Sequence, residues 1–200
     1  MLTRRSPMPG ATVVESSPVV PFRLPVDAVY ATAVLSPTQM LACFFWGRSI
    51  GYREPLLLLD FSCTLLEAQS WAMIQRTLTE LNMLRRARTG HALGMWIEGE
   101  ALAHQAMHAG IDARQIPPHL TRDEAWHPIC QSVAALMAGG SVDYTPRAQE
   151  AMEARPFPNT SGPRTDDPLV PAFLYGVVLG LDEVLARDPH PKMPVRSSRA

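Results

Sequence analysis

Three short apolar runs stand near the start of the chain and give way to segments with helical periodicity. The runs cover residues 26–35, 40–46 and 56–61, and their β-branched, aromatic and aliphatic side chains predict buried strands. The Ser-Pro-Thr sequence at 36–38 predicts a turn that joins the first two as a hairpin. The third run reads LLLLDF, and its continuous apolarity predicts cover on both faces. Such an opening indicates a sheet on which later helices pack.

The rest of the chain alternates between helical and strand patterns. Capping-box spacing at Thr64 and Glu67, and again at Thr121 and Glu124, predicts the starts of two helices, and Pro128 should kink the second or delay its start. Asp167 before Pro168 predicts another helix start. The predicted helices span residues 64–86, 100–109, 121–137 and 167–185, and the further strands span 92–98, 113–116 and 141–145. This order predicts an α/β fold with a mixed sheet and helices on its faces.

Proline placement suggests how the chain is divided. Prolines crowd the first 25 residues, the stretch after Tyr144 and the last residues, whereas Pro55 alone interrupts the stretch 38–116. We therefore expect a Pro-rich tail at 1–21, one globular domain at 22–187 and a basic tail at 188–200. The stretch after Tyr144 is expected to be rich in loops.

Composition narrows the classes of function. No apolar run approaches the roughly 20 residues that a membrane span requires. The formal net charge of −1 means that no global positive field favours nucleic acid, so any such binding must be local. The three cysteines are widely spaced, which indicates reduced thiols and a cytoplasmic location rather than disulfides or a CxxC metal site.

Three acidic positions fall at the ends of predicted elements. Asp27 lies in the first strand, Glu98 closes the fourth, and Asp166-Asp167 begins the last helix. If these carboxylates met at one sheet edge, they could hold two Mg²⁺ or Mn²⁺ ions and activate water for phosphodiester cleavage. Each acid also has an ordinary structural interpretation, as a turn residue, a surface residue or an N-cap.

The pattern between residues 96 and 146 adds a resemblance. An acid-tipped strand, a small-residue helix, an Ile-Pro-Pro strand end, an arginine-bearing helix and a Gly-x-Val-x-Tyr-x-Pro edge follow in order. The residues concerned are Glu98, Ile116, Pro118, Arg122, Gly140, Val142, Tyr144 and Pro146. Together with Val26-Asp27-Ala28 and Thr165-Asp166-Asp167, this order resembles the nuclease domain of phage large terminase subunits, the DNA-packaging motors. The resemblance covers roughly residues 22–186.

That resemblance implies an RNase H-like fold and a metal-dependent endonuclease that cuts double-stranded DNA during genome packaging. Asp27, Glu98 and Asp167 would be the catalytic ligands of two Mg²⁺ or Mn²⁺ ions, with Asp166 and Glu100 as further candidates. Arg122, Arg147 and Arg164 would contact DNA phosphates. The chain has no G-x-x-x-x-G-K-[ST] loop, so a separate packaging ATPase, a portal or a small terminase subunit is an implied partner. A phage-encoded protein would act in the host cytoplasm.

Two other interpretations share the fold. Val29-Tyr30-Ala31 is apolar after Asp27, which favours a packaging module that has lost its metal site and binds DNA or protein without cutting. The second alternative interpretation is a different RNase H-like nuclease, such as a junction resolvase.

Other residues give weaker signals. His104 and His108 have the i, i+4 spacing of zinc ligands, but no third ligand is evident. Cys63 and Cys130 show no recognisable nucleophile–base spacing with a histidine, and the arginines at 85, 86 and 88 complement a helix end as readily as they contact DNA. Three tryptophans at apolar positions, Trp71, Trp96 and Trp126, are expected in the core.

Overall fold

The computed structural model of the chain describes residues 26, 28–49, 55–84, 94–153 and 166–182. The predicted tails at 1–21 and 188–200 lie outside these residues. So do Asp27, Arg164 and the arginines at 85, 86 and 88.

The described strands form a six-stranded mixed sheet at the centre of the molecule, in the order β5-β4-β1-β2-β3-β6. Its strands are β1 (Ala28–Leu35), β2 (Met40–Arg48), β3 (Leu56–Leu65), β4 (Met95–Ile97), β5 (Ala113–Gln115) and β6 (Val142–Tyr144). β2 is antiparallel to β1 and β3, while the pairs β1–β4, β4–β5 and β3–β6 are parallel. The expected hairpin, the three-strand opening and the mixed sheet are confirmed.

The β1–β2 turn follows the predicted Ser-Pro-Thr sequence. The Ser36 Oγ accepts the backbone N–H of Met40 at 3.0 Å and lies 2.8 Å from the Thr38 Oγ1. Gln39 has a φ of 63°, in the left-handed region, which helps to reverse the chain between the strands. The hairpin is therefore closed by local polar contacts.

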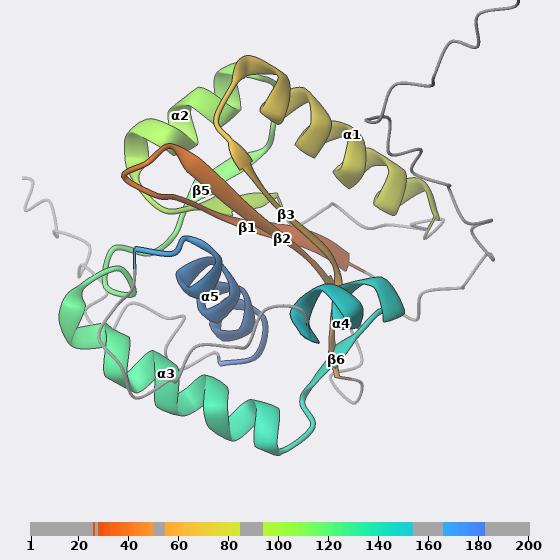
Figure 1. Cartoon of the computed structure of the whole chain (residues 1–200), viewed down its shortest axis with the longest axis vertical. Helices are drawn as coiled ribbons and strands as arrows, with labels where there is room; N and C mark the ends of the chain where they lie inside the picture. Colours follow the sequence, from red (N-terminus) through yellow and green to blue (C-terminus); the bar gives the residue numbers. More distant parts are fainter. Residues whose placement is uncertain (1–25, 27, 50–54, 85–93, 154–165, 183–200) are drawn as a thin grey trace, which may run out of the picture.

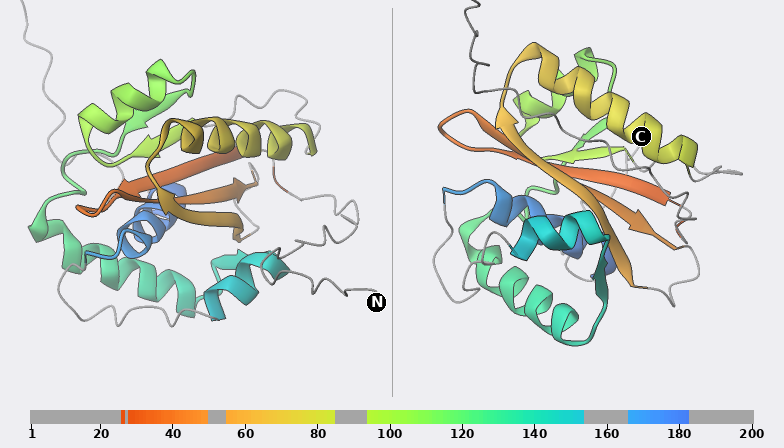
Figure 2. Two further views of the ribbon diagram at one scale, coloured as in Figure 1. Left: turned by 45° about the horizontal axis from the view of Figure 1, so that its top comes forward. Right: turned by 45° about the vertical axis from the view of Figure 1, so that its right-hand side comes forward.

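Among the described residues, five helices cover the two faces of the sheet (Figures 1 and 2). They are α1 (Ala68–Leu84), α2 (Glu100–His108), α3 (Asp123–Ala138), α4 (Pro146–Glu153) and α5 (Leu169–Leu181). α1 and α2 lie on one face, and α5, α3 and α4 lie on the other, with α5 between the sheet and α3. The sheet thus separates two apolar clusters, one centred on α5 and the other beneath α1 and α2.

Some predicted boundaries were wrong. Thr64 does not begin a helix, because β3 continues to Leu65 in pairing with β2; α1 begins at Ala68. There the Ser70 Oγ accepts the N–H of Glu67 and donates to the Leu65 carbonyl. The pairing of β3 with β2 outweighed the local capping signal.

Two further differences lie in the second half of the chain. α3 begins at Asp123 with Arg122 as its N-cap, and Pro128 is accommodated inside the helix without delaying its start. The stretch after Tyr144, expected to be loop-rich, contains α4, whose proline occupies the first helical position. A proline there loses no helical hydrogen bond, so Pro146 is a helix-start residue.

Candidate functional site

The end of the sheet at which β1 and β4 finish holds the sequence-predicted acid Glu98. Ala33 pairs with Ile97 in the parallel β1–β4 ladder, and the Glu98 N–H donates to the Ala33 carbonyl at 3.0 Å. Glu98 therefore follows β4 directly, beside the last residues of β1, and it is half-buried. We call this end, with Val34, Ser36, Glu98, Asp166 and Asp167, the rim.

α5 brings the aspartate pair to the same end. The Thr32 Oγ1 donates to the Ala172 carbonyl at 2.8 Å, and the Tyr30 Oη donates to the Gly176 carbonyl at 2.6 Å. Thr32 follows Tyr30 along β1, but its acceptor Ala172 precedes Gly176 along α5, so α5 runs antiparallel to β1. Its first turn therefore lies where β1 ends, and Asp166 and Asp167 are exposed there.

Asp167 makes a capping hydrogen bond at the start of α5, although Pro168, and not Asp167 as predicted, occupies the N-cap position. Its Oδ1 accepts the backbone N–H of Leu169 at 3.0 Å, and the carbonyl of Asp167 accepts the N–H of Val170. The side-chain bond satisfies one of the N–H groups that a helix start leaves without a helical partner. One carboxylate oxygen of Asp167 is thereby used within the fold.

Glu98 is bonded to α5 through a residue that sequence analysis did not single out. The Tyr175 Oη donates to the Glu98 Oε1 at 3.3 Å, and Tyr175 itself is fully buried. The bond joins the end of β4 to α5 across the rim. No sequence spacing links the two residues, because they are 77 positions apart.

The end of β1 places no acid beside Glu98. The residues there include Val34 and Ser36, both buried, and the Ser36 hydroxyl bonds within the hairpin turn. β1 starts at the opposite end of the sheet, where Ala28 pairs with Arg48. Asp27 precedes that start and lies outside the described residues.

The rim residues can be tested against the needs of two divalent cations. Mg²⁺ and Mn²⁺ take oxygen ligands, and a two-ion centre needs carboxylates that bridge or flank both ions. Within the described part of the chain, no three His, Cys, Asp or Glu side chains are grouped to hold a metal ion. Glu98 and Asp167 each commit an oxygen to a hydrogen bond, and Glu100 is exposed at the start of α2. The described donors alone therefore do not make up a two-ion centre, and Asp27 lies outside the described residues.

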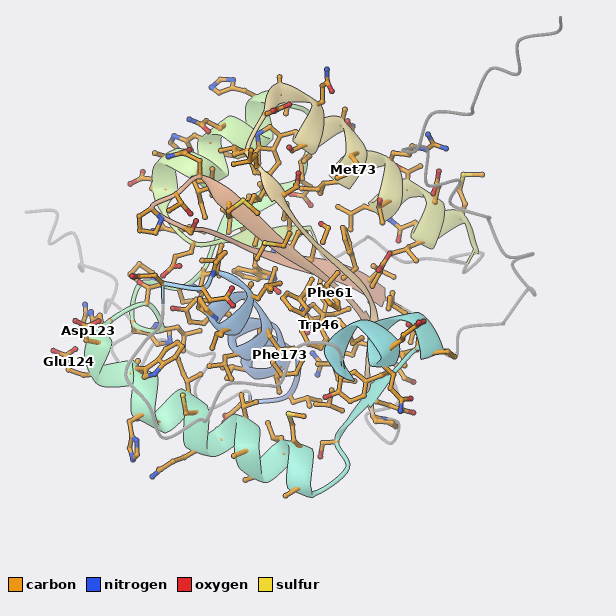
Figure 3. The ribbon with its side chains drawn as sticks, viewed as in Figure 1. Trp46, Phe61, Met73, Asp123, Glu124 and Phe173 are labelled. Atoms are coloured by element: carbon orange, nitrogen blue, oxygen red, sulfur yellow. The ribbon has the colours of Figure 1, made fainter. Side chains whose placement is uncertain are left out.

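The predicted DNA-contacting arginines are only partly described. Arg122 is the N-cap of α3 and is exposed, next to the exposed acids Asp123 and Glu124 that Figure 3 shows pointing away from the sheet. The side chain of Arg147, on α4, lies outside the described residues, as does Arg164. Arg114 on β5 places its guanidinium carbon 5.9 Å from the Trp96 ring centroid.

Little in the described part of the chain supports zinc or cysteine chemistry at the weaker candidate positions. His104 and His108 are exposed on α2, and no metal-holding group of three includes them among the residues described. Burial raises the pKa of the Cys43 and Cys130 thiols, which disfavours the thiolate that nucleophilic chemistry needs. Of the tryptophans expected in the core, Trp71 and Trp126 are buried, and Trp96 is half-buried.

Comparison with known proteins finds the fold but no sequence relative. No protein family and no curated protein matches the sequence. Among solved structures, the nuclease domain of the P22 large terminase is similar over 80% of this chain and 84% of that chain, with a TM-score of 0.55 at 16% identity. The human cytomegalovirus terminase nuclease domain matches over 80% and 86%, with a TM-score of 0.54 at 10% identity.

A longer protein is similar as well. The large terminase of a thermophilic bacteriophage matches 79% of this chain with a TM-score of 0.53 at 11% identity. The chain covers 40% of the length of that protein. These likenesses establish the RNase H-like architecture of terminase nuclease domains for this chain, as predicted. No described helix is long and apolar enough to cross a membrane.

Proposed function

We propose that this chain is a DNA-packaging module that uses the terminase nuclease fold for binding and not for cutting. The fold supports a role in packaging. The observation that supports binding without cleavage is the composition of the rim. There Val34, near the end of β1, and Ser36, just after it, lie beside a Glu98 that accepts a hydrogen bond from Tyr175. A two-ion hydrolysis site would need further carboxylates beside Glu98.

The charge of the rim favours a protein partner over DNA. Glu98, Asp166 and Asp167 place negative charge at the rim, and Glu100 adds a further acid at the start of α2. DNA phosphates are repelled by such a surface unless cations neutralise it. The partner that we propose is therefore another packaging protein, namely a separate packaging ATPase, a portal or a small terminase subunit, in the host cytoplasm.

The first test is a plasmid-cleavage assay in Mn²⁺ or Mg²⁺. It compares the purified wild-type chain with a Glu98→Gln variant. We expect both proteins to leave supercoiled plasmid intact. We also expect calorimetry to show the same Mn²⁺ binding for the wild type and for Glu98→Gln. Mn²⁺-dependent nicking by the wild type that disappears in Glu98→Gln would overturn the proposal. A pull-down with each candidate packaging protein then identifies the partner, and retention of duplex DNA alone would favour a DNA-binding role.

A metal-dependent endonuclease is the second candidate, favoured by the presence of Glu98 and Asp167 at the same end of the sheet. In that mechanism Asp27, Glu98 and Asp167 would hold the ions, with Asp166 and Glu100 in support and Arg122, Arg147 and Arg164 on the DNA. The same assay separates it from the first proposal, since Asp27→Asn, Glu98→Gln and Asp167→Asn should each abolish cleavage of double-stranded DNA. A preference for four-way junctions over linear duplex would instead indicate a junction resolvase.

A further inference from the structure

Buried side chains of the sheet donate hydrogen bonds to the backbone of α5. Tyr30 donates to the Gly176 carbonyl at 2.6 Å, and Thr32 donates to the Ala172 carbonyl at 2.8 Å. The Thr32 Oγ1 also accepts the Trp46 indole N–H at 3.0 Å. The Thr32 hydroxyl therefore connects β2 to α5, with its donor and an acceptor position both used.

These bonds favour one position of α5 along β1. Their acceptors are separated by about one helical turn, from Ala172 to Gly176, and their donors by two strand residues, from Thr32 to Tyr30. A slip of α5 by one residue would move every carbonyl by about 1.5 Å and turn it by about 100°. Both hydroxyls would then be buried without acceptors, which is costly in an apolar interior.

Close approach of α5 to the sheet depends on two glycines. A Cβ at Gly176 would collide with the Trp46 indole, and a Cβ at Gly180 would collide with the Tyr30 hydroxyl. Figure 3 shows Trp46 and Phe173 together between the sheet and α5, where their ring centroids lie 5.2 Å apart. The helix therefore sits within reach of the sheet hydroxyls only because its facing positions are small.

The position of α5 decides what stands at the rim. Tyr175, which lies between the two acceptor carbonyls in sequence, carries the hydroxyl that donates to Glu98. Asp166 and Asp167 directly precede the start of α5, at Leu169. We infer that Tyr30 and Thr32 are positioning residues that set the register of α5 on β1 and thereby place Tyr175 on Glu98. This inference concerns the rim on which the proposed function depends, but its test requires neither DNA nor a partner.

A double-mutant cycle on the full chain tests the coupling, because Thr32 and Tyr175 act on α5 through different bonds. Tyr175→Phe is measured in the wild type and in Thr32→Val by urea unfolding. We expect Tyr175→Phe alone to lower the folding equilibrium constant about fivefold to tenfold, and less than about twofold once Thr32→Val has released the register. Thr32→Ser keeps the hydroxyl and should restore the full effect of Tyr175→Phe.

Ser62→Ala is the matched control, since Ser62 carries a buried hydroxyl that has no hydrogen-bond partner among the described residues. It should leave the effect of Tyr175→Phe unchanged. The Trp46 indole N–H resonance should move in Thr32→Val and not in Thr32→Ser. If Thr32→Val does not fold, Tyr30→Phe replaces it in the cycle. Equal effects of Tyr175→Phe in both backgrounds would overturn the inference, because a hydroxyl that only stabilises the core gives additive changes.

Discussion

The two faces of the sheet bury similar kinds of apolar side chain, yet they hold their helices by different means. On the α5 face, Tyr30 and Thr32 donate to helix carbonyls, and eleven of the thirteen residues of α5 are buried. On the opposite face, α1 is held through apolar residues such as Trp71 and Ile74, while the side-chain hydrogen bonds of Gln75 and Arg76 are exposed.

This difference separates stability from position. Apolar contacts are non-directional, so a helix held by them can adjust its place at small cost. Hydrogen bonds to particular carbonyls are directional and distinguish one register from the next. The face that carries the rim is the one whose helix has its position specified.

The largest losses of unfolding free energy should come from truncated core side chains, and they should be similar on the two faces of the sheet. Phe173→Ala removes a fully buried ring under α5, and Ile74→Ala removes a buried side chain under α1. We expect losses of about 3–5 kcal/mol and about 2–5 kcal/mol in the free energy of unfolding, since both leave cavities. Urea denaturation measures both. A cost near zero for Ile74→Ala would show that α1 contributes little to the core.

Glycine substitution should sharpen the contrast. Gly176→Ala places a methyl group against the Trp46 indole, and we expect a loss of about 3 kcal/mol from overpacking. Gly139→Ala is the control, because a Cβ at that position makes only ordinary contacts, the shortest being 3.4 Å to the Ala135 carbonyl. In thermal unfolding, Gly176→Ala should have a clearly lower melting temperature than Gly139→Ala. Equal melting temperatures would contradict close packing of α5.

Removal of single hydroxyls compares a bonded group with an unbonded one. Thr32→Val leaves the Trp46 indole N–H buried without its acceptor, and we expect a loss of about 1–2 kcal/mol. Ser62→Ala removes a buried hydroxyl without a described partner, so it should be neutral or slightly stabilising. The measurement is the urea midpoint at constant m-value. A greater cost for Ser62→Ala would reverse the comparison.

Alkaline pH should weaken the α5 face through Tyr30. Burial raises the pKa of the Tyr30 phenol above its ordinary value, so the folded chain keeps this proton where the unfolded chain loses it. The stabilisation is therefore complete below pH of about 10 and is lost as pH rises, at up to about 1.4 kcal/mol per pH unit. Urea midpoints between pH of about 9 and about 11 should fall less steeply in Tyr30→Phe, and identical slopes would exclude this contribution.

Local sequence patterns predicted most of the elements and part of the rim. The turn at Ser36 and the acid that follows β4 stand where the sequence places them, and Asp167 bonds to the start of α5 although Pro168 is the N-cap. The capping signal at Thr64 misled because strand pairing with β2 extends β3 through that residue. Whether Asp27 belongs to the site stays a prediction. The roles of Thr32 and Tyr175 were not predicted, because hydroxyls within apolar runs look like ordinary core residues.

The amino-acid sequence by itself determined the α/β class, the hairpin and the order of most strands and helices, because periodicity, turn residues and caps act over a few neighbouring positions. Only the tertiary structure decided which residues meet at the rim and what anchors α5. Those contacts join residues 77 to 146 positions apart. No local preference specifies such pairs; they follow from how the packed helix lies on the sheet.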